Sequence, residues 1–259
     1  MRVSKITDIE KIFNEIRDCA RCPFKDKGFT FYADHTTPYE FMLVLQNPLS
    51  TSKRRSLEME EAESAHNLKQ RVKVHQRYFS DWFLFRKNRK FIERFLNLFK
   101  EYKLIDLDNH EEYIKHEFFD DFYVTDLIKY WCTTSEIEEK HVEHAVKHLQ
   151  REISLVKPRL IISFGTRVWE ALKGQFKLKA YQRWESKVDP DRDKETVSNV
   201  HGFLFKSCSP PPNHEVFVIP LVHLSARTRN MLLRDSYIQY LREGIQLYAR
   251  KRSSSRKVT

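Results

Sequence analysis

The sequence has no long hydrophobic run. No stretch approaches the roughly 18 apolar residues that a membrane-spanning helix needs. Residues 1–13 alternate charged with apolar side chains and lack the apolar core of a secretory signal. We therefore expect a soluble, intracellular protein, in the cytoplasm, on the nucleoid or in a nucleus, with no membrane partner.

Glycine and cysteine are also scarce. The 5 glycines in 259 residues form no Gly-rich phosphate loop, which argues against a nucleotide-processing enzyme of the phosphate-loop kind. The cysteines are Cys19, Cys22, Cys132 and Cys208. In a reducing compartment, the spacing of Cys19 and Cys22 is more typical of a metal or cluster site than of a disulfide.

Acidic residues are fewer than basic residues. Lys and Arg number 46 against 36 Asp and Glu, which gives a formal charge of +10. This excess favours a polyanionic partner, with nucleic acid ahead of an acidic membrane surface. A charge-rich surface without such a partner, as in heat-adapted proteins, explains the same numbers. Charge alone therefore does not select a function.

The chain alternates strand patterns with helix patterns. Apolar runs with the length of buried strands lie at Phe41 to Leu45, Asp120 to Lys129, Arg159 to Gly165 and Val216 to Val222. Apolar residues recur at helical spacing in residues 6–16, 91–99, 136–157, 166–172 and 229–249. The alternation predicts an α/β fold, a three-layer αβα sandwich with a four-stranded, mostly parallel central sheet.

Residues 1–249 are expected to form a single domain. Two polar stretches, at about 50–77 and 173–213, are interpreted as insertions, the second with a hairpin at residues 201–206. Residues 250–259 are basic and have the composition of a disordered tail.

Polar side chains follow three of the predicted strands. Gln46-Asn47-Pro48 comes directly after the first strand, Asp126 ends the second, and His223-Leu224-Ser225 follows the last. The carboxyl ends of parallel strands meet at one edge of a sheet, where α/β proteins usually hold their ligands. We therefore expect a functional site at this edge.

In this order, these motifs resemble the uracil-DNA glycosylase superfamily. The resemblance covers roughly Cys19 to Gly244 and is carried by the CxxC, QNP after the first strand, FYVTDLIK, PRLIISFG after a helix, and the final HLS. The CxxC makes the chain most similar to the iron-sulfur branch, called family four. The resemblance implies a DNA glycosylase of base excision repair, which hydrolyses the N-glycosidic bond of a flipped uracil or related deaminated base.

The family motif after the first strand holds the attacking water. Asn47 matches the catalytic residue that positions this water. Gln46 matches a substrate-binding residue that lies along the pocket edge, with its backbone amide toward the pyrimidine. Leu45 replaces the usual glycine, so we expect a narrower pocket or a displaced base.

The family motif after the last strand usually reads His-Pro-Ser. His223 matches the catalytic histidine that donates a hydrogen bond to the pyrimidine O2 as negative charge builds there. Leu224 replaces the proline, and Ser225 matches a residue expected near a DNA phosphate. Arg227 and Arg229 follow at positions suited to the backbone of the flipped nucleotide. A histidine that caps the next helix is the alternative for His223.

Asp126 departs from the family, which commonly has an asparagine there to read uracil O4 and N3-H. A carboxylate accepts from N3-H but repels O4, and it suits an exocyclic amine. Asp126 therefore indicates another altered base such as a deaminated purine, a partly protonated carboxyl, or a catalytic general base. A residue that caps the following segment is the alternative.

The family also stacks an aromatic ring on the extruded base. We expect Phe79 in this role, ahead of its neighbours Tyr78 and Trp82, with core packing as the alternative.

The resemblance further implies a [4Fe-4S] cluster with Cys19, Cys22 and Cys132 as ligands. Helix register places Ala145 at the fourth family position. The candidates for the fourth ligand are Cys208, His141, His144 and His148. The alternatives are that the protein has lost the cluster, or that the site binds zinc.

The implied partner is damaged or deaminated DNA, double- or single-stranded, and we expect a monomer. The competing hypothesis is a protein of the same fold that binds nucleic acid without excising a base. Leu45, Asp126 and Leu224 favour it, because each changes a motif position.

Overall fold

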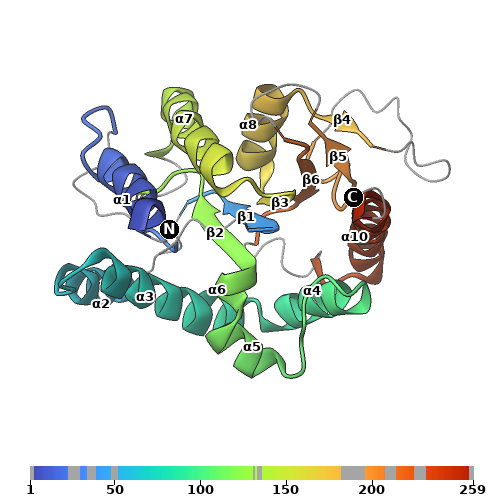
Figure 1. The fold of residues 1–259 in the computed structure, drawn as a ribbon, viewed down its shortest axis with the longest axis horizontal. Helices are drawn as coiled ribbons and strands as arrows, with labels where there is room; N and C mark the ends of the chain where they lie inside the picture. Colours follow the sequence, from blue (N-terminus) through green and yellow to red (C-terminus); the bar gives the residue numbers. More distant parts are fainter. Residues whose placement is uncertain are drawn as a thin grey trace.

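Within the described residues, a central sheet of six strands organises the chain, in the order β2-β1-β3-β6-β5-β4 (Figure 1). The structure is a computed structural model that describes residues 3–22, 30–33, 39–47, 52–130, 132, 136–181, 196–207, 214–224 and 232–256. The strands are β1 Phe41–Leu45, β2 Phe122–Asp126, β3 Leu160–Phe164, β4 Lys179–Ala180, β5 Phe205–Lys206 and β6 Phe217–Leu221.

The four longer strands form the predicted parallel core, whereas the sheet edge differs from the prediction. β2, β1, β3 and β6 pair in parallel and are buried along their whole length, as expected of continuous apolar runs. The expected total of four strands is wrong, because β5 and β4 extend the sheet antiparallel beyond β6. The hairpin expected at residues 201–206 is instead one strand, β5, which pairs with both neighbours.

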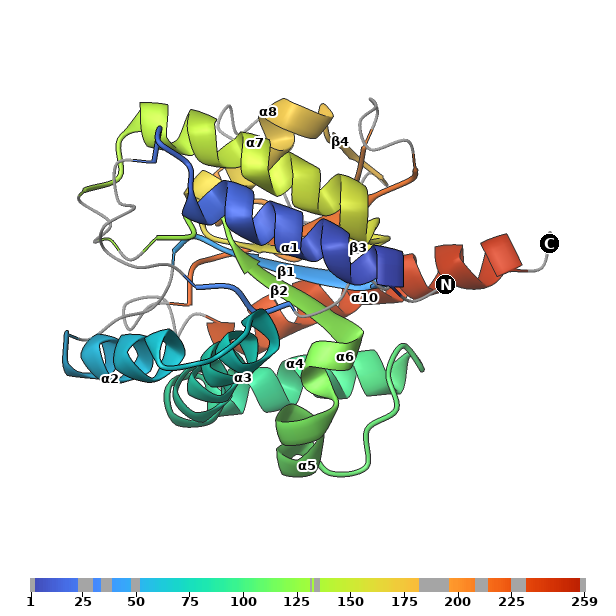
Figure 2. The ribbon, with the colours of Figure 1, turned by 60° about the vertical axis from the view of Figure 1, so that its left-hand side comes forward.

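Helices cover both faces of the sheet and make the predicted three layers (Figure 2). One face carries α1 Val3–Arg17, α7 Glu139–Val156 and α8 Thr166–Phe176. The other side carries α2 Ser52–Glu63, α3 Leu68–Tyr78, the π-helix η2 Phe79–Lys87, α4 Arg89–Glu101, α5 His110–His116, α6 Phe118–Asp121 and α10 Asp235–Arg256. None of the helices in the described ranges combines the length and apolar character needed to span a bilayer.

Aromatic rings fill the core between α4 and the sheet. Phe41 of β1 meets Phe99 of α4 edge-on with ring centroids 5.0 Å apart, and Phe122 of β2 lies 5.3 Å from each of them. The stripe of Phe91, Phe95 and Phe99 on α4 is buried as predicted. Truncating one such ring to alanine typically costs about 3–5 kcal/mol, so this cluster is a major source of stability.

The second half of α10 corrects the prediction of a disordered tail. The helix runs to Arg256, so residues 250–256 are helical. Arg252 donates from Nη2 to Glu40 Oε2 at 2.7 Å, and the Tyr248 hydroxyl donates to Glu40 Oε1 at 2.9 Å. These bonds to a residue beside β1 favour the helical conformation over the disorder that the basic composition indicates.

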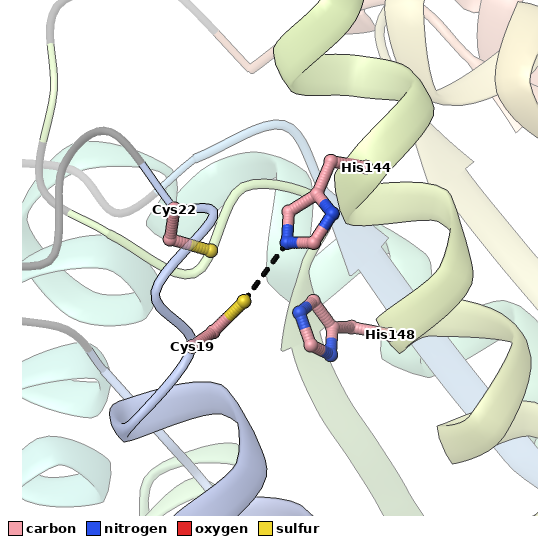
Figure 3. A group of neighbouring side chains, drawn as sticks. All are labelled: Cys19, Cys22, His144 and His148. Atoms are coloured by element: carbon pink, nitrogen blue, oxygen red, sulfur yellow. Dashed lines mark hydrogen bonds between the residues drawn. The ribbon is translucent and has the colours of Figure 1, made fainter.

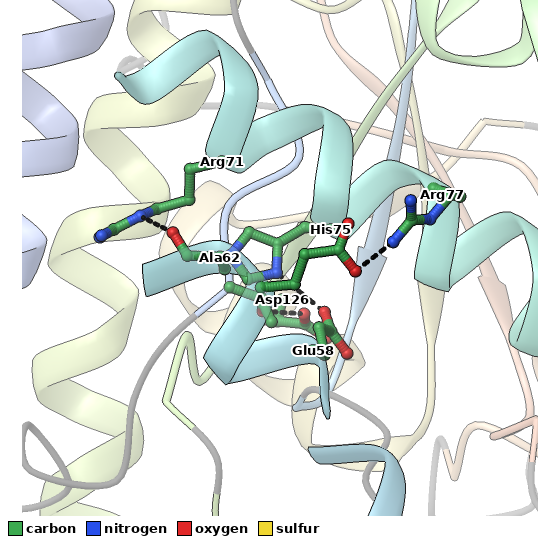
Figure 4. Close-up of polar contacts among 8 residues, drawn as sticks. Glu58, Ala62, Arg71, His75, Arg77 and Asp126 are labelled. Carbon is green, nitrogen blue, oxygen red and sulfur yellow. Dashed lines mark hydrogen bonds and ion pairs between the residues drawn. The ribbon is translucent and has the colours of Figure 1, made fainter. Parts of the chain in front are cut away.

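Within the charged stretch expected at about 50–77, the described residues form α2 and α3. His75 Nδ1 lies 2.8 Å from Glu58 Oε1, and both side chains are almost fully buried (Figure 4). Arg71 Nε donates to the Ala62 carbonyl at 3.1 Å. This segment has little apolar surface, so polar contacts join its two helices.

Candidate functional site

The carboxyl ends of β1, β3 and β6 meet around Gly165. This residue follows β3, caps α8 and has φ of 98°. A Cβ placed on it would lie 3.2 Å from His223 Cδ2 and 3.7 Å from Gln46 Oε1. Glycine is suited here, because L side chains rarely adopt this backbone conformation. Gln46 and His223, far apart in sequence, are thus neighbours at the predicted edge of the sheet.

Asn47 is held by a backbone contact. Its Nδ2 donates to the Cys132 carbonyl at 2.9 Å, and its Oδ1 lies 3.5 Å from Gln46 Nε2. The short bond uses the nitrogen of the amide, whereas the contact to the oxygen is long and weak. The Asn47 side chain is therefore oriented with its oxygen as the more available acceptor.

Asp126 lies opposite Leu45 in the pairing of β1 with β2. Its side chain is buried, with the residue 2% exposed, and Oδ2 accepts from Thr30 Oγ1 at 3.4 Å. Burial raises the pKa of Asp126 to about 7, although Lys129, Thr30 and Tyr32 act in the opposite direction. The carboxyl therefore exists in both protonation states near neutral pH, and its protonated form can donate as well as accept.

A buried ion pair fixes the end of β2 to α7. Lys129 Nζ lies 2.8 Å from Glu152 Oε1, with the two side chains 3% and 0% exposed. Glu152 Oε2 also accepts from Thr125 Oγ1 at 2.7 Å, and Lys129 donates to the Asp126 carbonyl. No spacing in the sequence indicated this network, because charged residues in polar surroundings usually belong to the surface.

Phe79 opens the π-helix and lies in an aromatic wall. It is 6% exposed, stacks on Phe83 at 4.7 Å and lies 5.1 Å from the Tyr32 ring. Tyr32 also interacts with Asp126 and is 6.5 Å from the His75 ring. The wall therefore borders Asp126 through Tyr32, and π-helical turns are frequent at functional sites.

His223 is partly exposed, and burial lowers its pKa from the ordinary value. It is therefore neutral at neutral pH, with one ring nitrogen able to donate. Val222, which precedes His223, is held by His201: the Val222 N–H donates to His201 Nδ1 at 3.2 Å. His201 is buried and was not predicted, since an isolated histidine beside a glycine carries no signal of this contact.

A second cluster lies between α1 and α7. The ligand atoms of Cys19, Cys22, His144 and His148 all lie within 4.8 Å of one another (Figure 3). Cys19 Sγ is 3.0 Å from His144 Nε2, and the rings of His144 and His148 are 5.0 Å apart. The cysteines lie in the segment directly after α1, and the histidines are one turn apart on α7.

The group differs from the predicted ligand set at Cys132. Cys132 does not belong to the described group, because its segment lies beside Asn47 and lends that residue its carbonyl. His141 is also outside the group, and its Nδ1 accepts from the Glu138 N–H at the start of α7. Residues Pro48, Cys208, Ser225, Arg227 and Arg229 lie outside the described residues.

The residues of this cluster fit a metal ion but not the implied [4Fe-4S] cluster. They offer two thiols and two imidazoles, whereas [4Fe-4S] clusters are held by four thiolates. His148 Nε2 is buried and has no hydrogen-bond partner within the described part of the chain. Burial lowers the pKa of His148 to about 4 and also lowers that of His144, so both rings are in the neutral form that binds metals.

Comparison with known proteins gives one family. The model of the uracil DNA glycosylase superfamily matches residues 50–243, which include Asp126 and His223 but begin after Asn47. No curated protein matches the chain. The match is to the superfamily as a whole, so assignment to the iron-sulfur branch stays a prediction. The matched residues span more than half of the chain, which therefore belongs to the uracil DNA glycosylase superfamily.

Proposed function

We propose that this protein is a DNA glycosylase that hydrolyses the N-glycosidic bond of uracil or a related deaminated base in DNA. The observation that carries the proposal is the meeting of Gln46, Gly165 and His223 at the carboxyl edge of the sheet, next to the oriented amide of Asn47. Membership of the superfamily supports a hydrolytic glycosylase.

Asn47 and His223 have complementary roles in the proposed reaction. The Asn47 amide oxygen accepts a hydrogen bond from the attacking water, while the Cys132 carbonyl keeps the amide from rotating. The neutral His223 imidazole donates to the base oxygen on which negative charge builds. A preorganised donor of this kind contributes roughly 3 kcal/mol to transition-state stabilisation.

Asp126 is proposed to read the edge of the flipped base. When protonated, the carboxyl donates to O4 and accepts from N3-H, as an asparagine amide does at uracil. When ionised, it favours a base with an exocyclic amine. The nearby Phe79 ring is proposed to stack on the base, which is worth about 1–3 kcal/mol in comparable sites.

The test uses the full-length protein with duplex and single-stranded oligonucleotides that carry uracil, hypoxanthine or xanthine. Abasic sites are detected as alkali-labile breaks. Asn47→Ala and His223→Ala should each lower the single-turnover rate by about 100-fold or more. The matched controls Asn97→Ala and His116→Ala alter exposed residues elsewhere and should retain the rate. Activity that survives in both Asn47→Ala and His223→Ala contradicts the site assignment.

A second candidate is a protein that binds nucleic acid without excising a base. The burial of Asp126 and its contact with Thr30 favour this candidate, because the carboxyl is covered where a base edge has to reach it. If none of the oligonucleotides yields abasic sites while DNA still binds with a steep salt dependence, the binding protein is the better description.

A further inference from the structure

We propose that Cys19, Cys22, His144 and His148 bind a single Zn²⁺ ion, in a structural site that fastens α1 to α7. The inference does not depend on the proposed glycosylase activity.

The size of the group suits a single ion. Zn²⁺ binds sulfur at about 2.3 Å and imidazole nitrogen at about 2.0–2.1 Å, so a tetrahedral site holds its ligand atoms about 3.3–3.8 Å apart. The four ligand atoms here already lie within 4.8 Å of one another. A cluster of four irons and four sulfides occupies the centre of its ligands and needs them farther apart. Zinc therefore requires only small side-chain shifts, whereas the cluster requires α1 and α7 to separate.

The donor atoms also favour zinc. Two thiolates and two imidazoles in a tetrahedral arrangement form one of the common structural zinc sites. His148 Nε2 is buried without a hydrogen-bond partner among the described residues. Leaving a buried polar atom unsatisfied is costly, and a metal bond would satisfy this one. Figure 3 shows the four side chains directed toward a common centre, the cysteines from the loop after α1 and the histidines from α7.

The position of the site indicates a structural role. All four ligands come from the protein, which leaves no open position for water or substrate. The carboxyl end of α1 already contacts its surroundings through the Tyr130 hydroxyl, which donates to the Ile16 carbonyl, and through the exposed Arg151–Glu15 ion pair. An ion at Cys19 and Cys22 would add a strong link at the point where the chain leaves α1.

The first experiment measures bound metal in the full-length protein purified without oxygen. We expect equimolar zinc, with neither iron nor acid-labile sulfide. X-ray absorption should give two sulfur neighbours at about 2.3 Å and two nitrogen neighbours at about 2.0 Å. Iron together with sulfide, including the form in which two cysteines and two histidines hold a two-iron cluster, would overturn the proposal.

The second experiment identifies the ligands. Cys19→Ala and His148→Ala should lose the zinc, whereas the matched controls Cys132→Ala and His116→Ala should keep it. A strong chelator should lower the melting temperature of the wild-type protein by more than about 5 °C and leave that of His148→Ala unchanged. Loss of zinc from Cys132→Ala but not from His148→Ala contradicts the assignment. If the ligand variants do not fold, replacing the metal of the wild-type protein with cobalt tests the ligand assignment. Two thiolates and two imidazoles should give the absorption spectrum of tetrahedral cobalt. A spectrum of octahedral cobalt would contradict the assignment.

Discussion

Gly165 and His223 meet across the carboxyl edge of the sheet, with only 3.2 Å between His223 Cδ2 and the place where a Cβ of residue 165 would be. Gly165 has no side chain to contribute, yet it sets the space in which the His223 ring lies. A residue at the start of α8 therefore shapes the site through its backbone alone.

Gly165→Ala should reduce both stability and activity. The methyl group crowds the His223 ring, and φ of 98° strains any residue with a Cβ, at a cost of about 1–3 kcal/mol. Gly174→Ala is the matched control, since it lies inside α8 with nothing within 4 Å of the added Cβ, and it should raise stability by about 0.5–1 kcal/mol. Urea denaturation and single-turnover excision measure both effects. Wild-type behaviour of Gly165→Ala would show that this contact is unimportant.

Excision of uracil should decline as the pH rises above 7. The pKa of Asp126 is raised to about 7, so the protonated carboxyl that matches uracil is lost above this pH. The pKa of His223 is lowered, so that ring stays neutral from pH 7 upward. The rate should fall about tenfold per pH unit above pH 8. Asp126→Asn should remain active and lose this decline, and a similar decline in the variant would assign it to another group.

The same residue should make folding stability depend on pH. The folded-state pKa of Asp126, about 7, exceeds the ordinary value of 3.8, so the folded protein binds the proton more tightly than the unfolded chain. The free energy of unfolding therefore falls as the pH rises from about 4 to about 7. Asp126→Asn should be more stable than wild type at pH 8, by on the order of 4 kcal/mol, and similar at pH 4. Asp108→Asn, at an exposed position, should shift neither value, and equal effects of both variants would exclude this explanation.

Removing one partner of the buried ion pair should be costly. Glu152→Gln leaves Lys129 charged and buried without its carboxylate, which typically costs about 3–5 kcal/mol. Glu93→Gln, in the more exposed pair with Arg89 on α4, should cost less than about 1 kcal/mol. Chemical denaturation at pH 7 compares the two variants. Equal losses would show that the burial of Lys129 is unimportant for stability.

The placing of the polar residues at one sheet edge could be predicted from the sequence, because they end strands that are buried on both faces. β1 and β6 are continuous apolar runs, and β2 is apolar as far as Val124, so the sequence alone places the polar residues at their carboxyl ends at one edge. β4 was missed and β5 was expected only as part of a hairpin, because two residues are too short for a periodic pattern. The helical end of α10 was missed, because it depends on contacts of Arg252 and Tyr248 with the distant Glu40.

The metal ligands could be predicted only in part. The CxxC was recognisable from its spacing, and helix register pointed to the neighbourhood of Ala145. Which side of α7 faces the cysteines depends on the angle at which α1 packs against α7, and this packing angle cannot be predicted from the sequence. His144 and His148 share the side that meets them, whereas Cys132 is drawn away by the course of the chain after β2. Residues in a buried polar network, such as Lys129 and Glu152, have no pattern that separates them from surface charges.

The order of the strands in the sheet has a consequence for how the chain folds. β1 lies between β2 and β3, and β6 joins the far side of β3, so every neighbouring pair of parallel strands is separated by a long crossover. Contacts between such distant segments make folding slow. His223 follows β6, the last of the described strands, so it can reach Gly165 only after β6 has paired with β3. We expect the site to be among the last parts of the molecule to form during refolding, and partly folded chains to lack it.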